Sequence, residues 1–75
     1  MSWNLEGLRV EGGYLSGDIR VSGKVVLSRV QYGGVVQHTI VLDEGFSILG
    51  GAVKRDAGER VLVEHPFIYR ILGSN

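Results

Sequence analysis

Short apolar runs alternate with glycine-containing breaks along the whole chain. β-branched valine is the commonest apolar residue, whereas alanine, the strongest helix former, occurs only at positions 52 and 57. Apolar runs separated by turn residues at short intervals are typical of all-β folds. We therefore predict a single β domain over residues 1–75, with six or seven short antiparallel strands and no helix. The expected architecture is a small barrel or sandwich, built as a meander of tight hairpins.

Residues 24–42 carry the strongest hairpin pattern. Two β-rich runs, 24–32 and 35–42, flank Gly33 and Gly34, and both positions of a two-residue hairpin turn favour glycine. We predict a second hairpin in which the run 14–21 is joined to residue 24 through Ser22 and Gly23.

Two-residue turns at both places would divide the side chains between two faces. The largely apolar face, which we expect to be the core, carries Leu15, Ile19, Val26, Val30 and Val41. The mixed face carries Val25, Leu27, Ile40 and Leu42 beside Arg20, Arg29 and His38. A slip of one residue in either turn would exchange the faces.

The C-terminal third predicts a further hairpin. Residues 46–53 and 60–64 form its arms, with a tip at 54–59 in which Gly58 takes the left-handed position. Gly50-Gly51 indicates a bulge or bend in the first arm. Pro66 ends the second arm because it donates no ladder hydrogen bond. Residues 67–72 form the last strand, and residues 5–10 form the first.

Composition bears on how such a small domain is stabilised. The chain has no cysteine and only two histidines, which excludes disulfides and thiolate metal sites, so we expect neither a metal nor another cofactor. Oligomerisation is the remaining common support for a small core. The formal net charge is zero, which removes a barrier to self-association. We therefore expect a homo-oligomer.

The same counts limit partners and location. A general nucleic-acid binder usually has a basic excess, and this chain has none, although a local basic patch would be compatible with these counts. There is no stretch of 18 uncharged apolar residues and no signal-peptide pattern at the start. We expect no membrane contact and a cytoplasmic location, and a viral origin is compatible with the sequence.

A polar row on the mixed face suggests the first candidate site. The predicted register places Ser16, Arg29 and His38 side by side, with Asp18 diagonal to them. A catalytic triad would need an enclosed nucleophile and an oxyanion hole, which an open sheet face does not offer, and no glycine motif for nucleotides is present. We therefore predict that the protein is not an enzyme.

Ligand recognition is the alternative to a plain polar surface row. Arg29 offers a bidentate donor for phosphate or carboxylate, and His38 a hydrogen bond. Tyr32 could stack on a base. Lys54, Arg55 and Arg60 gather cations at the predicted 54–59 tip, where repetition around a ring would add avidity.

Two short segments resemble the tryptophan-dependent RNA-binding attenuation protein family. Leu27-Ser28-Arg29 and Leu42-Asp43-Glu44-Gly45 are similar to that family's Leu-Thr-Arg and Leu-Asp-Lys-Gly segments, at nearly the same separation. Gly33-Gly34 stands where the family has a threonine-containing ligand loop. The resemblance implies a ring of β-subunits, and no ligand or RNA-binding residue is carried over.

Two functions follow from these expectations. The first is a non-enzymatic oligomeric β-module that binds a small anionic ligand, a nucleotide or a short nucleic acid. The second is a structural or partner-protein adaptor without a ligand, such as a small phage or assembly protein, in which the mixed face is an interface.

Overall fold

The computed structural model describes residues 3–73 and shows an all-β protein, as predicted. Its seven strands and two 3₁₀ turns follow one another in the order β1 (Arg9–Tyr14), β2 (Ile19–Val30), β3 (Val36–Leu42), β4 (Phe46–Ile48), η1 (Leu49–Gly51), β5 (Val53–Arg55), β6 (Arg60–Glu64), η2 (His65–Phe67) and β7 (Ile68–Gly73). The strand count therefore falls within the predicted range.

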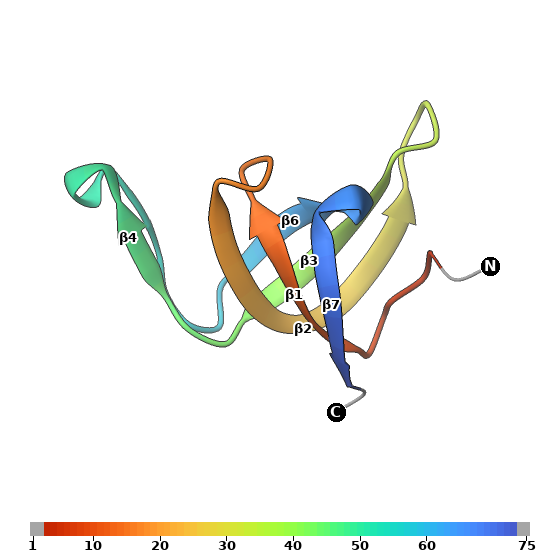
Figure 1. The fold of residues 1–75 in the computed structure, drawn as a ribbon, viewed down its shortest axis with the longest axis horizontal. Helices are drawn as coiled ribbons and strands as arrows, with labels where there is room; N and C mark the ends of the chain where they lie inside the picture. Colours follow the sequence, from red (N-terminus) through yellow and green to blue (C-terminus); the bar gives the residue numbers. More distant parts are fainter. Residues whose placement is uncertain (1–2, 74–75) are drawn as a thin grey trace.

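Five strands form one antiparallel sheet in the order β6-β3-β2-β1-β7, and β4 pairs only with β5. The sheet curls along the length of β2, which runs below and behind β1 in Figure 1. It does not close into a barrel, so β6 and β7 are its two edge strands. The β4–β5 hairpin projects to one side of this body.

The hairpin across Gly33-Gly34 is confirmed, but its register is not the predicted one. Both glycines have positive φ, 91° and 90°, as the turn signal requires. Val30 opposes Val36, and Gln31 N donates to Val35 O (2.6 Å), so the loop contains three residues, Tyr32 to Gly34. The extra residue shifts the predicted cross-strand pairs from Leu27 to Val30 by one position, and beyond Val26 the pairs are shifted by two.

The predicted core face of this hairpin is wrong as a result. On β3, His38, Ile40 and Leu42 are buried and Val41 is not. On β2, a register shift between Val25 and Leu27 marks a bulge at Val26, so Val25 and Ser28 both point inward. A bulge adds one residue to one strand and so reverses the alternation beyond it.

The predicted hairpin at Ser22-Gly23 does not exist, because β2 runs through both residues. A Cβ atom at Gly23 would overlap the carbonyl oxygen of Val41, so this glycine allows β2 to bend closely against β3. The chain reverses at Leu15–Asp18 instead, where Asp18 N donates to Leu15 O (3.2 Å). Leu15 and Ser16 both have positive φ there.

The C-terminal third also pairs differently from the prediction. Gly50 and Gly51 lie at the tip of a separate hairpin in which Phe46 opposes Arg55. Residues 56–59 follow the base of that hairpin, and β6 pairs with β3 rather than with residues 46–53. Pro66 lies in η2 and ends β6, as expected, and the last strand follows it.

The first strand begins later than predicted, at Arg9. Residues before it form a turn in which Leu8 N donates to Leu5 O (3.0 Å), and Gly7 N donates to Val25 O (2.8 Å). This turn carries Leu5 into the core. The buried apolar residues are Leu5, Val10, Val21, Val25, Ile40, Leu42, Val61 and Val63.

Candidate functional site

His38, a predicted ligand residue, lies in the core rather than on a surface. Its relative exposure is 0%, because the observed register turns it inward between β2 and β6. Its Nδ1 lies 2.8 Å from Ser28 Oγ, and its Nε2 lies 2.9 Å from His65 Nδ1. Both ring nitrogens are thus engaged inside the protein.

This Ser28–His38–His65 chain also connects to the N-terminal segment. Leu5 N donates to Ser28 Oγ (3.1 Å), and Ser28 N donates to Glu6 Oε2 (2.9 Å). Because Ser28 Oγ already accepts from Leu5, its hydroxyl proton can go to His38 Nδ1, and His38 Nε2–H then donates to His65 Nδ1. The neutral form of His38 satisfies the whole chain of hydrogen bonds.

The surroundings favour that neutral form. Burial lowers the pKa of His38 below its ordinary 6.5, and the neighbouring His65 ring lowers it further. Ser28 is itself buried, so its hydroxyl does not meet solvent where a substrate could bind. The network joins β2, β3, η2 and the N-terminal turn.

The other predicted ligand residues lie on separate elements. Arg29 is exposed on β2 opposite Gln37, and Tyr32 is fully exposed in the β2–β3 loop. Lys54 and Arg55 lie on β5 and not at a hairpin tip, and Arg60 begins β6 opposite Val41. The structure therefore does not gather these residues into one pocket.

A hollow of about 150 Å³ opens beside β6. Its lining combines the end of β1, the β1–β2 loop, the start of β3, the edge strand β6 and η2. The lining residues are Gly13, Tyr14, Leu15, Ser16, Gln37, Leu62, Glu64 and Phe67. The walls are mainly apolar, with Gln37 and Glu64 as the polar side chains of the strands. Ser16 adds a hydroxyl from the loop, but no hydrogen bond joins it to Glu64 in the described part of the chain, and no basic residue lines the hollow.

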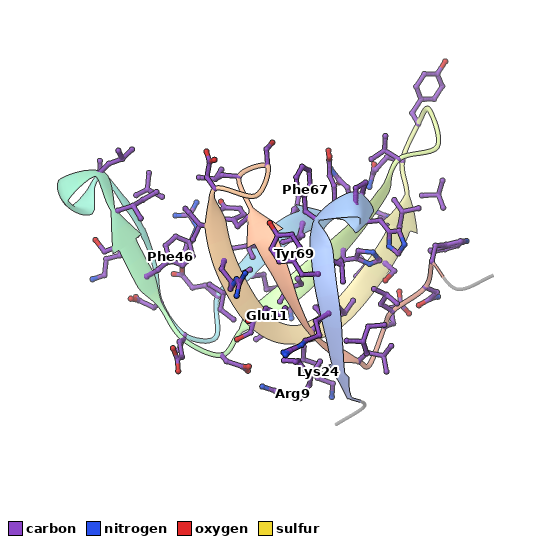
Figure 2. The ribbon with its side chains drawn as sticks, in the orientation of Figure 1. Arg9, Glu11, Lys24, Phe46, Phe67 and Tyr69 are labelled. Atoms are coloured by element: carbon purple, nitrogen blue, oxygen red, sulfur yellow. The ribbon has the colours of Figure 1, made fainter. Side chains whose placement is uncertain are left out.

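Glycines bring the loop wall of this hollow close to η2 and β7. A Cβ atom at Gly13 would overlap Tyr69 Oη, and one at Gly17 would lie 3.2 Å from the Phe67 ring. Tyr69 therefore packs directly against the end of β1, and Phe67 against the β1–β2 loop. Figure 2 shows Phe67, in η2, above Tyr69 on β7.

Sequence reasoning missed the Ser28–His38 contact, the hollow and the projecting hairpin. The first depended on the third residue of the β2–β3 loop, which pairs Ser28 instead of Arg29 with His38, and the Gly33-Gly34 signal does not reveal that residue. The hairpin has one, because Gly50-Gly51 stands between β-prone residues, as Gly33-Gly34 does, and the same pattern also predicts a bend.

Among residues 3–73, no group of three or more His, Asp or Glu side chains is placed to hold a metal ion. No helix in this part of the chain is long and apolar enough to cross a membrane. Comparisons with protein-family models, curated proteins and solved structures found no match to the chain.

Proposed function

We propose that this protein is a non-enzymatic assembly module that associates with further copies of itself. The observation that carries the proposal is the hairpin of residues 46–55, called the arm below. The arm extends from the body (Figure 1). Leu49 at its tip is exposed, and Ile48 and Val53 are half-buried.

The arm is attached mainly at its base. The Phe46 ring lies 5.8 Å from the Tyr14 ring, and Arg55 Nη2 donates to Tyr14 Oη (3.5 Å). Figure 2 places Phe46 between the arm and the body. Beyond this base, β4 and β5 pair with each other and pack on η1. A two-stranded hairpin alone is marginally stable in water, so the arm would gain stability from packing on another molecule.

The tip of the arm presents an apolar residue to solvent. Leu49 is 76% exposed and has a φ of 55°, a conformation that costs a non-glycine residue roughly 1–2 kcal/mol. Gly50 and Gly51, also with positive φ, complete the turn. A leucine exposed at a tight tip is suited to insertion into a partner.

A second copy fits the balance of apolar surface. Among the described residues, eight hydrophobic residues are buried and eleven large ones are exposed. A zero net charge leaves little self-repulsion between copies. The core is small, and association would bury apolar surface that the single chain leaves in water.

The substitution Leu49→Ser tests the arm. Sedimentation velocity over a concentration series should show an oligomer for the unaltered chain and a lower mass for Leu49→Ser. The matched control is Tyr32→Ser, which removes a fully exposed side chain from a different loop and should leave the mass unchanged. A monomeric unaltered chain, or equal masses for the unaltered chain and Leu49→Ser, would contradict the proposal.

The absence of catalysis belongs to the same proposal. The Ser28–His38 pair has hydrogen-bond geometry, but both residues are buried, and the hollow beside β6 contains neither of them. This arrangement supports a stabilising role for the pair.

A second candidate function is binding of an anionic ligand or a nucleic acid on the outer face of the sheet. Cross-strand pairing aligns Arg9 with Lys24, Lys24 with Val41, and Val41 with Arg60. Three cations therefore lie in one row across four strands, and Figure 2 shows Arg9 and Lys24 side by side. Asp43 pairs with Arg9 and partly neutralises the row, so we rank this function second.

A further inference from the structure

The edge strand β6 has a self-complementary sequence, Arg-Val-Leu-Val-Glu. We propose that β6 strands of two copies pair antiparallel about Leu62, which joins the two sheets across a two-fold axis. The inference rests on the proposed self-association and adds a symmetric contact to the one that the arm makes.

The backbone of β6 is available for such pairing. β6 is the end strand of its sheet, and its only ladder within residues 3–73 is with β3. Leu42 N donates to Glu59 O (2.9 Å), so Glu59 turns its backbone groups toward β3. Because this direction alternates along an antiparallel strand, the backbone groups of Arg60, Leu62 and Glu64 point to the open edge.

Antiparallel pairing centred on Leu62 matches these three residues with themselves. Arg60 of each copy faces Glu64 of the other copy, and Leu62 faces Leu62. Each of these pairs exchanges two hydrogen bonds, about six in all. The register therefore pairs all the outward-pointing backbone groups of the strand.

The side chains suit the same register. Arg60, Leu62 and Glu64 are exposed on one face, whereas Val61 and Val63 are buried in the core of their own chain. Neither Arg60 nor Glu64 takes part in an ion pair within the described part of the chain. Opposite charges directly across a sheet stabilise the pair, and like charges destabilise it.

Other edge contacts lack this complementarity. The second edge strand, β7, contains Arg70 and no acidic residue, so pairing centred on Arg70 would oppose two like charges. In β6, a shift of the centre to Val61 or Val63 separates Arg60 from Glu64. Charged residues on an edge strand disfavour random pairing. In β6, the positions of Arg60 and Glu64 on either side of Leu62 favour the register centred on Leu62.

Space beside the strand is consistent with an added partner. Leu62 and Glu64 border the hollow of about 150 Å³, so this edge faces an opening. A two-fold contact of this kind is closed and uses the same patch on both copies.

Charge reversal provides the test. In a dimer of Arg60→Glu, each of the two charged pairs brings two carboxylates together. In a dimer of Glu64→Arg, each pair brings two guanidinium groups together. Each variant should dimerise about tenfold more weakly than the unaltered chain. An equimolar mixture of the two variants should regain dimers, because every opposing pair then has opposite signs. Arg29→Glu, a reversal on the exposed face of β2, is the matched control and should have no effect.

A single introduced cysteine gives a second measurement. The chain has no cysteine, and directly opposed residues in a hydrogen-bonded pair lie about 5.5 Å apart at Cα, within disulfide range. Leu62→Cys should form a covalent dimer under mild oxidation, whereas Leu27→Cys, also exposed on the sheet, should not. Thermal unfolding of each variant confirms that it is folded.

The outcomes separate this contact from the arm. The β6 contact is overturned if the mixed charge variants do not regain dimers and Leu62→Cys does not cross-link. The arm proposal still stands in that case if Leu49→Ser lowers the mass of the oligomer. If the mixture recovers dimers and Leu62→Cys cross-links, the β6 contact holds even where Leu49→Ser has no effect.

Discussion

At the scale of single residues, His38 shows how a titratable side chain is held in a very small core. Ser28 and His65 satisfy its two ring nitrogens, which avoids the cost of an unpaired buried polar group, about 1–3 kcal/mol. The same contacts tie the N-terminal turn to β2 and β3. Its position makes His38 a determinant of stability.

The lowered pKa of His38 predicts that the protein loses stability in mild acid. Unfolded His38 binds a proton near pH 6.5, whereas folded His38 does so only at a lower pH. Between these two pKa values the unfolded chain holds more protons, so the free energy of unfolding decreases as the pH falls through 6.5. The full contribution is present above pH 6.5.

Urea unfolding at pH 7.5 and 5.5 measures this dependence, with few carboxylates titrating in the interval. His38→Gln keeps a donor and an acceptor but does not titrate, so it should flatten the dependence while costing about 1–3 kcal/mol at pH 7.5. An unchanged pH dependence in His38→Gln would assign the effect to another group.

At the scale of elements, β2 determines the shape of the body. It is 12 residues long and pairs with both β1 and β3, with a bulge at Val26 and a close approach to β3 at Gly23. Counted from the buried Val25, the bulge turns Leu27 toward solvent and Ser28 toward the core, and so decides which residues each face presents.

Gly23→Ala tests the bend. The added methyl group would overlap the carbonyl oxygen of Val41, which is backbone and cannot rotate away. We expect a loss of about 1–3 kcal/mol in the free energy of unfolding, measured from urea midpoints. Ser22→Ala, one position earlier in the same strand, is the control and should change the midpoint little. Equal midpoints for the two variants would show that β2 can separate from β3 at no cost.

At the scale of the whole molecule, the charges cancel in number but not in position. Arg9, Lys24 and Arg60 form a row on the outer face, whereas Lys54 and Arg55 lie on the arm. A zero net charge therefore does not exclude local binding of an anionic polymer, and this row is the surface on which we propose such binding.

Lys24→Gln tests the row. Binding of a fluorescent single-stranded oligonucleotide at low salt should weaken a few-fold, and the slope of log K against log salt should decrease by about 0.7 for the lost phosphate contact. Lys54→Gln removes one cation from the arm and should have no such effect. Equal losses in the two variants, or no binding by the unaltered chain, would remove the second candidate function.

The sequence by itself determined the fold class, the approximate strand count, the turn at Gly33-Gly34 and the break at Pro66. Each of these depends on backbone preferences that a few neighbouring residues set. The absence of disulfides likewise follows from composition alone.

Only the tertiary structure decided which residues face the core and which meet solvent. One extra residue in the β2–β3 loop and one bulge at Val26 each change the register by a single position, and a single position moves a side chain to the other face of a sheet. His38 therefore became a core residue instead of a ligand residue. Gly50-Gly51 forms the tip of an arm because β6 pairs with β3 and not with residues 46–53. This pairing joins distant segments, and no local pattern specifies it.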